Sequence, residues 1–184
     1  MAADEYSGPD TQAADTETTD SSEVSPELTP VSPKADKART STRKGLCFKR
    51  FFTADGVHPY DAVEWMEYDA IILNAEGETV FEQNGVEFPT CWSQRATNIV
   101  ASKYFHGQLG TPERESSLKQ LIGRVVGTMA QWGIDGEYFA TTEDAEIFSD
   151  ELTHLLLHQM VAFNSPVWFN IGIAGERQQA SACY

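Results

Sequence analysis

An abrupt change in apolar content near residue 45 constrains the fold of this 184-residue chain more than any other feature of its sequence. Residues 1–44 are rich in Ser, Thr, Pro, Asp, Glu and Ala. Their only large apolar side chains are Met1, Tyr6, Val24, Leu28 and Val31. Such a segment cannot bury enough surface to offset the entropy lost on ordering, so we expect a disordered tail. The folded part is expected to begin at Gly45, where the run LCFKRFF starts.

Charge is distributed unevenly along the chain. Residues 1–33 hold eight acids and no bases, residues 34–50 hold seven bases and one acid, and residues 51–184 hold 19 acids and 6 bases. The formal net charge is -15. A nucleic-acid-binding protein usually shows the opposite balance, so we expect no nucleic-acid partner. The basic stretch is typical of a solvated linker, with contact to RNA or an acidic surface as the alternative.

Targeting signals and cysteine usage indicate the compartment. No run of about 18 apolar residues occurs, so we expect no membrane partner. The N-terminus also lacks a basic start followed by an apolar stretch, which argues against a secretory signal. The three cysteines, Cys47, Cys91 and Cys183, have no zinc-like spacing. The sequence therefore predicts a cytoplasmic protein with free thiols.

The pattern after residue 63 predicts a β-hairpin and then a helix. Strands are expected at 65–74 and 79–88, joined by a turn in which Gly77 takes a positive φ. The segment SQRATNIVASKYF then predicts a helix with Ser93 as its N-cap and Gly107 past its end.

Two longer helices are predicted in the second half. The first is expected to begin at Thr111, with Pro112 in its first turn, and the second at Thr141 or Thr142. We expect the second to end at the tripeptide 164–166, and the run VWFNIGI after it to form a buried strand. The apolar positions that define the two helical faces are Leu118, Leu121, Ile122, Val125, Val126, Met129 and Trp132, then Phe148, Leu152, Leu155, Leu156, Met160 and Phe163.

Two histidine-containing patterns have both structural and functional interpretations. His154 and His158 stand four apart on a predicted helix, a spacing that two metal ligands could use, but no Glu follows His154 and no third ligand is evident. A packed pair of histidines explains them better, so we expect no metal site. The segment 58–61 (HPYD) could be an acid/base cluster, yet a proline-containing loop explains it equally well. Cys47 and Cys91 lie in apolar settings, where cysteine usually acts as a small hydrophobe.

The last 21 residues combine a helix stop, an apolar run, a polar loop and a cysteine. The hydroxyl of Ser165 could contact a phosphate or a sugar. Cys183 follows the small residues Ser181 and Ala182, which leave room for a ligand to approach the thiol. One cysteine by itself leaves a functional and a structural role equally open.

These residues resemble a known family. AFNSPVWFN followed by QQASACY is similar to the hallmark of the adenosylcobalamin-dependent (class II) ribonucleotide reductases. GVHPYDAVEW, SQRATNIVASKYF and ELTHLLLHQ also resemble segments of that family's N-terminal region. The likeness runs from about Gly45 to Tyr184 and leaves the tail outside it.

The resemblance implies an enzyme that reduces ribonucleoside di- or triphosphates to DNA precursors, with adenosylcobalamin as cofactor. Cobalt–carbon cleavage would generate a cysteine thiyl radical that abstracts the 3′-hydrogen. A pair of cysteines would then supply two electrons by forming a disulfide, which a thioredoxin-type reductant reopens. Cys183 matches the first cysteine of that pair. Ser165 matches a helix-end residue that contacts substrate, and Ala182 with Cys183 matches the substrate-facing loop. Many relatives have another cysteine in place of Ala180.

The resemblance also sets the expected organisation. We expect a tail over 1–44, an N-terminal reductase domain over 45–163, and the start of a catalytic barrel over 164–184. The fold class is mainly α with a small β-hairpin (α+β), leading into the first strand of a truncated ten-stranded α/β barrel.

The expected barrel has a consequence for activity, because the family places the second thiol, the radical cysteine and the cobalamin site there. The chain is therefore expected to be inactive alone, as a gene fragment, a frameshifted product or an intein-split piece. The alternative is a non-catalytic helical module that docks on a separate barrel-bearing partner. An ATP-binding regulatory domain ranks last, because no Gly-rich phosphate loop occurs.

Overall fold

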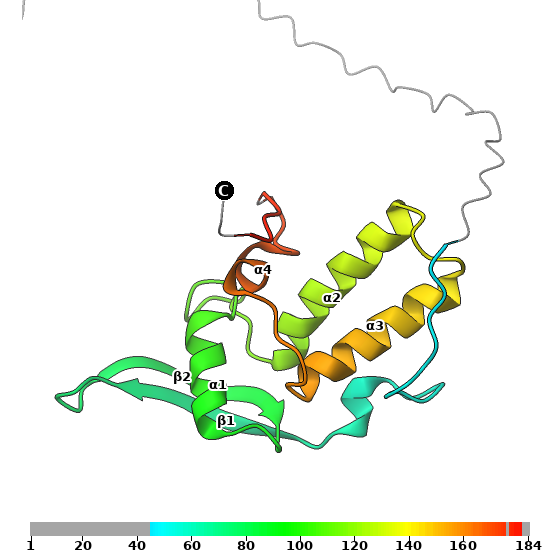
Figure 1. The fold of residues 1–184 in the computed structure, drawn as a ribbon. Helices are drawn as coiled ribbons and strands as arrows, with labels where there is room; N and C mark the ends of the chain where they lie inside the picture. Colours follow the sequence, from blue (N-terminus) through cyan, green and yellow to red (C-terminus); the bar gives the residue numbers. More distant parts are fainter. Residues whose placement is uncertain (1–44, 176, 182–184) are drawn as a thin grey trace, which may run out of the picture. The chain divides into compact units, whose positions relative to one another are not determined.

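The computed structural model describes residues 45–175 and 177–181. Within that part of the chain, four α-helices, one 3-10 helix and a two-stranded antiparallel hairpin form a small α+β unit (Figure 1). The elements are η1 (Pro59–Ala62), β1 (Trp65–Leu73), β2 (Thr79–Pro89), α1 (Gln94–Lys103), α2 (Leu118–Asp135), α3 (Thr142–Leu157) and α4 (Ser165–Asn170). The α+β class is confirmed. The tail expected over 1–44 lies outside the described residues.

The hairpin forms where its sequence predicts it. β1 pairs with β2 so that Ile71 faces Glu82. The side-chain oxygen of Asn74 closes the turn by accepting hydrogen bonds from the backbone N–H groups of Glu76 (3.0 Å) and Glu78 (2.8 Å). Gly77 has a φ of +85°, a conformation that costs glycine little. Short-range chemistry therefore specifies this element.

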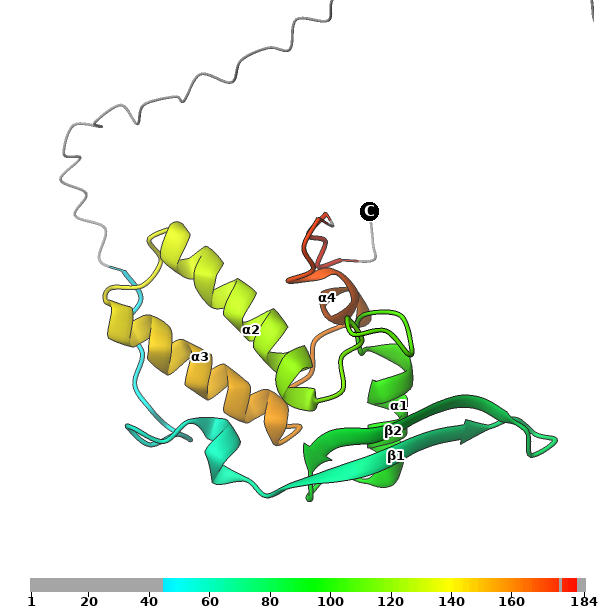
Figure 2. The same cartoon turned by 180° about the vertical axis from the view of Figure 1, so that it is seen from behind.

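Helix α1 packs on the hairpin and covers part of its edge (Figures 1 and 2). Ser93 is the N-cap as predicted, because its Oγ accepts a hydrogen bond from the Ala96 N–H at 3.2 Å. Two amide side chains of α1 also donate to carbonyl oxygens of β1. Gln94 Nε2 lies 3.0 Å from the oxygen of Asp69, and Asn98 Nδ2 lies 2.7 Å from that of Ile71.

The predicted start of the next helix at Thr111 is wrong. Helix α2 begins at Leu118 with Ser117 as its N-cap, and Ser117 and Gln120 form a reciprocal capping box. Glu113 and Glu115, which precede this cap, therefore belong to a loop. One of them, Glu115, turns inward and is only 8% exposed. The capping box and this inward turn outweigh the favourable position of Pro112.

Helix α3 begins as predicted and ends earlier than predicted. The Oγ1 of Thr141 caps it by accepting a hydrogen bond from the Asp144 N–H at 3.1 Å. The helix stops at Leu157, six residues before the expected end at Phe163, and Gln159 has a φ of +55°. Such a left-handed conformation is incompatible with a continuing helix. Phe163 therefore reaches the core from a non-helical segment.

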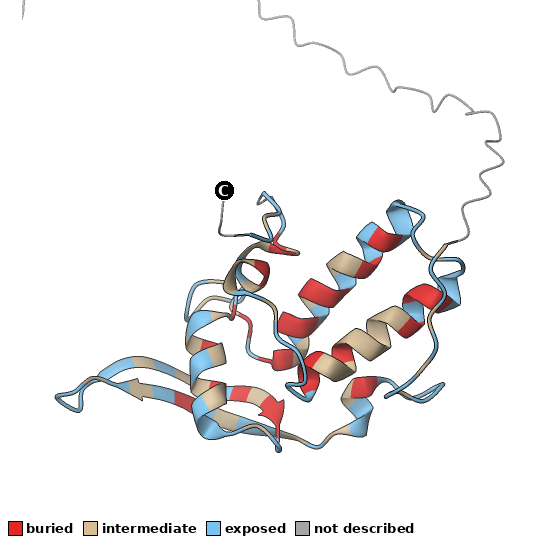
Figure 3. Ribbon diagram, viewed as in Figure 1, coloured by how far each residue is buried: buried red, intermediate tan, exposed pale blue. Residues whose placement is uncertain are grey.

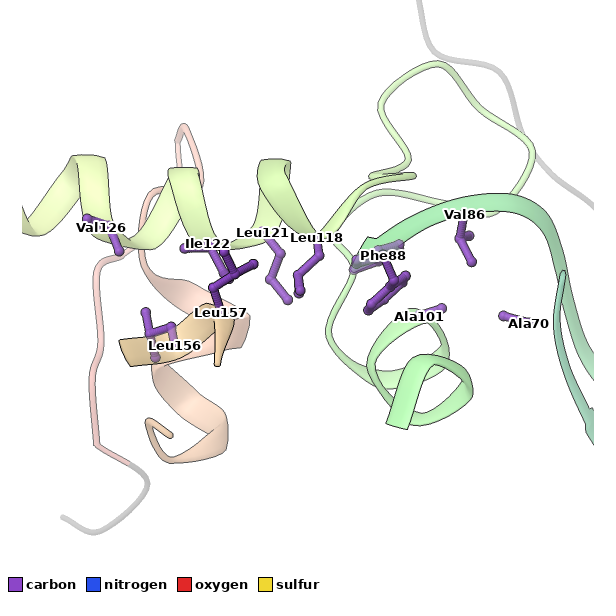
Figure 4. Packing of buried hydrophobic residues seen from close by; sticks show 11 residues of the cluster. Ala70, Val86, Phe88, Ala101, Leu118, Leu121, Ile122, Val126, Leu156 and Leu157 are labelled. Atoms are coloured by element: carbon purple, nitrogen blue, oxygen red, sulfur yellow. The ribbon is translucent and has the colours of Figure 1, made fainter. Parts of the chain in front are cut away.

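The core lies between α2, α3, α1 and the hairpin. α2 and α3 run side by side, with their buried residues facing each other, whereas the far end of the hairpin is exposed (Figure 3). Figure 4 shows α2 and α3 side chains meeting the hairpin and α1 side chains in one cluster. Its buried members are Ala70, Val86, Phe88, Ala101, Phe105, Leu118, Leu121, Ile122, Val126, Leu156 and Leu157.

The expected strand VWFNIGI is wrong, and with it the first strand of a barrel. Residues 165–170 form the short helix α4, and the described residues contain no strand that pairs with this segment. Pro166 is the second residue of the new helix, where its missing N–H and fixed φ are tolerated, and it does not end the previous helix. A short apolar run is compatible with a buried strand and with a buried helix, so its periodicity could not decide between them.

Residues 45–53, called the N-terminal strap below, lie along α3 without forming a strand of their own. Phe48 donates its backbone N–H to Oδ1 of Asp144 at 2.7 Å. Glu151 Oε1 accepts hydrogen bonds from the backbone N–H groups of Phe51 (2.8 Å) and Thr53 (3.0 Å). Polar groups of α3 thus hold the strap.

Candidate functional site

Ser165 opens α4, and its hydroxyl has a partner on α1. Oγ of Ser165 lies 3.2 Å from the phenolic oxygen of Tyr104, the residue that follows α1, and either atom can donate. The ring of Tyr104 stacks on Phe169 of α4, with 5.3 Å between ring centroids. The predicted helix-end residue is thus a helix-start residue that contacts α1.

The other end of α4 is attached to α2 by Arg124. Its guanidinium donates to the carbonyl oxygens of Ile171 (2.7 Å) and Trp168 (3.2 Å). Carbonyl groups at the C-terminal end of a helix have no backbone N–H partner within the helix, so they are free to accept these bonds. Nε of Arg124 lies 2.7 Å from Glu115 Oε1, and the two side chains are only 11% and 9% exposed. The charge that holds α4 is therefore itself paired and buried.

Gly172 lets α4 approach Arg124 closely. Its φ is +78°, and a Cβ at this position would lie 2.6 Å from both Cγ and the backbone oxygen of Arg124. Neither the conformation nor the space accommodates another residue without movement. The turn after α4 is therefore fitted to α2.

The segment after α4 folds back on the helix. Asn170 Nδ2 donates to the carbonyl oxygen of Gln179 at 3.1 Å. The Gln178 side chain accepts from the Gly172 N–H at 2.7 Å and donates to the Ile173 carbonyl at 3.0 Å. Ala182 and Cys183, the other two predicted site residues, lie outside the described residues.

Sequence reasoning missed both residues that hold α4. Tyr104 was included only as part of a helical segment. Arg124 lies off the apolar stripe of α2, so its spacing resembles that of an ordinary surface base. A signal for either role would require knowing which elements pack together.

An apolar pocket of about 410 Å³ lies beside this region. Its walls come from α1, from α2 and from residues 156–168, and they include Tyr104 and Trp168. The aromatic side chains are fixed by hydrogen bonds, since Trp92 Nε1 donates to the Leu157 carbonyl and Trp168 Nε1 to the Phe163 carbonyl. The pocket thus lies between α1, which precedes Tyr104, and the segment that leads into α4.

His154 of α3 contacts both His158, the residue that follows the helix, and the strap. The ring centroids of His154 and His158 are 4.1 Å apart, and His154 also stacks on Phe52. Burial, together with the nearby His158, lowers the pKa of His154. No group of three or more His, Cys, Asp or Glu side chains with metal-binding geometry occurs among the described residues.

The segment 58–61 has a structural role. His58 caps η1, with its Nδ1 accepting a hydrogen bond from the Tyr60 N–H at 3.2 Å. Burial raises the pKa of Tyr60, whose hydroxyl donates to the Lys119 carbonyl at 3.2 Å. These contacts fit the loop interpretation of HPYD.

The apolar interpretation of Cys47 and Cys91 is wrong, because both are exposed free thiols. Their neighbours Phe48 and Trp92 contact the protein instead. Helices long and apolar enough to cross a membrane are absent from the described residues.

Comparison with known proteins gives the family. Residues 67–159 match the sequence profile of the family described as class II vitamin B12-dependent ribonucleotide reductase. This chain belongs to that family. The vitamin B12-dependent ribonucleotide reductase of Streptomyces coelicolor is 55% identical over 146 residues, that of Streptomyces avermitilis 53% over 152, and that of Rhodopirellula baltica 47% over 142.

These reductases are much longer than this chain. The match to the S. avermitilis protein covers 82% of the chain and 16% of that relative, and the match to the R. baltica protein covers 76% and 14%. The family profile ends at residue 159, before Ser165. The roles of Ser165, Ala182 and Cys183 therefore remain predictions.

The apolar pocket does not fit the cofactor of the reductase family. Pockets that enclose a drug-sized ligand span about 300–1,000 Å³. A pocket of about 410 Å³ is near the lower end of that range, whereas a corrin ring with its axial groups is far larger than a drug. We derive no chemical step through a cobalamin bound to this part of the chain.

Proposed function

We propose that this chain supplies the N-terminal part of a cytoplasmic ribonucleotide reductase that converts ribonucleotides to deoxyribonucleotides for DNA synthesis. Membership of the class II vitamin B12-dependent family carries the proposal, supported by 47–55% identity to three reductases of that family. The attachment of α4 to α1 and α2 adds support, because it gives the segment around Ser165 a defined position.

The chain's own contribution to the chemistry is a substrate contact and one thiol. Ser165 donates a hydrogen bond to the bound nucleotide. Loss of the 2′-hydroxyl as water and its replacement by hydrogen require two electrons and two protons, which two thiols provide by becoming a disulfide. Cys183 is one of these thiols, and Ala182 lies with it on the substrate-facing loop.

The remaining components belong to protein outside the matched region. They are the second thiol, a radical-bearing cysteine and the site for adenosylcobalamin, which supplies the radical chemistry when bound. The substrate is a ribonucleoside di- or triphosphate, and a thioredoxin-type reductant reopens the disulfide.

The test is complementation in one polypeptide. The chain is fused to the part of the S. coelicolor reductase that follows its matched region, and cobalamin-dependent deoxynucleotide formation is measured with a dithiol reductant. We expect activity that Cys183→Ser abolishes. Cys91→Ser is the matched control, because Cys91 is an exposed free thiol that we expect to be dispensable. Turnover that survives Cys183→Ser would contradict the assignment.

A second candidate function is a non-catalytic module that docks on a barrel-bearing partner. Two exposed apolar side chains at the apolar pocket, Ile99 and Val161, favour it, because exposed apolar surface suits burial against another protein. Mixing the separate chain with the truncated S. coelicolor reductase distinguishes the two. Activity that appears only with the chain and depends on Cys183 supports the catalytic role, whereas binding without activity supports the module.

A further inference from the structure

We propose that Tyr104 is a positioning residue that orients the hydroxyl of Ser165 toward the bound nucleotide. The inference rests on the proposed function, because it assumes that Ser165 contacts substrate. It assigns to α1, an element far from Ser165 in sequence, a role in arranging the site.

The contact between the two hydroxyl groups carries the inference. The phenolic oxygen of Tyr104 and Oγ of Ser165 are 3.2 Å apart and partly buried. Typical O–H···O bonds span about 2.5–3.0 Å, so this one is long. A serine hydroxyl has one donor hydrogen and two acceptor lone pairs, so Ser165 can bind a second partner while it contacts Tyr104.

The chemistry of the two groups sets the direction of the hydrogen bond. A phenol is a much stronger acid than an aliphatic alcohol and therefore the better donor. When Tyr104 donates to Ser165 Oγ, the serine keeps its own hydrogen. That hydrogen is then available to a phosphate or sugar oxygen of the nucleotide, both of which are acceptors.

Packing fixes both partners, so the contact is a property of the fold. The Tyr104 ring stacks on Phe169, and the Tyr104 N–H donates to the Val100 carbonyl at 2.9 Å. On the other side, Arg124 holds the end of α4. A Tyr104→Phe substitution keeps the ring and its stacking, and removes only the hydroxyl.

The experiment uses the fusion with the S. coelicolor reductase described above. We expect Tyr104→Phe to raise the KM for the ribonucleotide about three- to fivefold and to leave kcat nearly unchanged. The reason is that Ser165, without its orienting partner, forms a weaker hydrogen bond to the nucleotide. A substrate contact that is equally strong in the ground state and the transition state changes KM and leaves kcat unchanged. The midpoint of thermal unfolding should stay within about 2 °C of the parent.

A double-mutant cycle separates positioning from a general structural effect. If Tyr104 acts through Ser165, Tyr104→Phe should have no further effect on KM in the Ser165→Ala background. Tyr138→Phe is the matched control, since Tyr138 is 59% exposed and follows the C-terminal end of α2. It should leave KM and kcat unchanged.

Two outcomes overturn the inference while the proposed function stands. Both apply to a fusion that Cys183→Ser inactivates. The first is an unchanged KM in Tyr104→Phe. The second is a KM increase that Tyr104→Phe causes equally in the Ser165→Ala background and in the parent. A fusion whose turnover survives Cys183→Ser instead contradicts the proposed function, and the inference falls with it.

Discussion

The N-terminal strap and α4 are attached to the same helical core by groups of opposite charge. Glu151 of α3 gathers backbone N–H groups of the strap, whereas Arg124 of α2 gathers backbone carbonyls of α4. In each segment, one long charged side chain of the core binds more than one backbone group. The environments differ, because the Arg124 side chain is only 11% exposed and paired with Glu115, while the contacts of Glu151 with Phe51 and Phe52 are exposed.

This difference in exposure predicts which of the two sets of contacts contributes more to the free energy of unfolding. Water competes for exposed carboxylates, so hydrogen bonds to them contribute modestly. Removing one partner of a buried ion pair leaves an uncompensated charge and costs much more. The site-bearing end of the chain should therefore be held more firmly than the strap.

The largest effect is expected for Arg124→Met. The substitution leaves the Glu115 carboxylate buried without its cation and frees two carbonyls of α4, so we expect unfolding free energy to fall by about 3–5 kcal/mol. Urea denaturation of the 184-residue chain measures this. Adding Glu115→Gln should recover part of the loss, since the buried charge is then gone. A cost below about 1 kcal/mol for Arg124→Met would reverse the comparison.

The next effect tests the fit of α4 against α2. Gly172→Ala should cost about 2–4 kcal/mol, because its Cβ would meet Arg124 at 2.6 Å and because φ is +78°. Gly175→Ala is the matched control, with a φ of +79° and no atom within 4 Å of the added Cβ. It should cost only about 1–2 kcal/mol. Equal losses by denaturation would show that close packing contributes nothing.

A smaller effect is expected at the strap. Glu151→Gln removes a charge that accepts several hydrogen bonds, and at this part-exposed position we expect a loss of about 1 kcal/mol. Glu146→Gln, on the exposed face of the same helix, should change stability by less than about 0.5 kcal/mol. Hydrogen exchange at the amides of Phe51 and Thr53 should accelerate only in Glu151→Gln. Unaltered exchange in that variant would show that Glu151 does not hold the strap.

The smallest effect is the response to mild acid. Burial raises the pKa of Glu151, but the hydrogen bonds from the Thr53 side chain and the strap N–H groups lower it by more, so the net pKa lies below its ordinary value of 4.5. The group therefore stabilises the fold above pH 4.5, and this contribution is lost as pH falls through the folded-state pKa. The lowered pKa of His154 acts in the same direction, with stability decreasing below about pH 6.5. Denaturation at pH 7, 5.5 and 4 should show a shallower decline in Glu151→Gln, and an identical decline would remove Glu151 from this account.

The sequence predicted elements that short-range contacts specify. The hairpin turn depends on Asn74 and Gly77 within a few residues, and the caps Ser93 and Thr141 act on their own helices. Such signals need no knowledge of the tertiary structure.

The sequence failed where distant residues decide the conformation. The sequence near Pro112 gives no sign that Glu115 pairs with Arg124. The sequence near Trp168 likewise gives no sign that the Arg124 guanidinium donates to the carbonyl groups at the end of α4. For the same reason Ser165 was predicted as a site residue, while its partner Tyr104 was not. Ala182 and Cys183 remain predictions based on resemblance.

The amides that α1 extends to the hairpin also limit self-association. An open strand offers its unpaired backbone groups to any other extended chain. The side chains of Gln94 and Asn98 already donate hydrogen bonds to the carbonyl groups of Asp69 and Ile71. These two carbonyls of β1 are therefore not free to pair with a strand of a second molecule. The six acids and no bases of residues 65–89 add like-charge repulsion between copies. A hairpin with its far end in solvent can thus stay unaggregated.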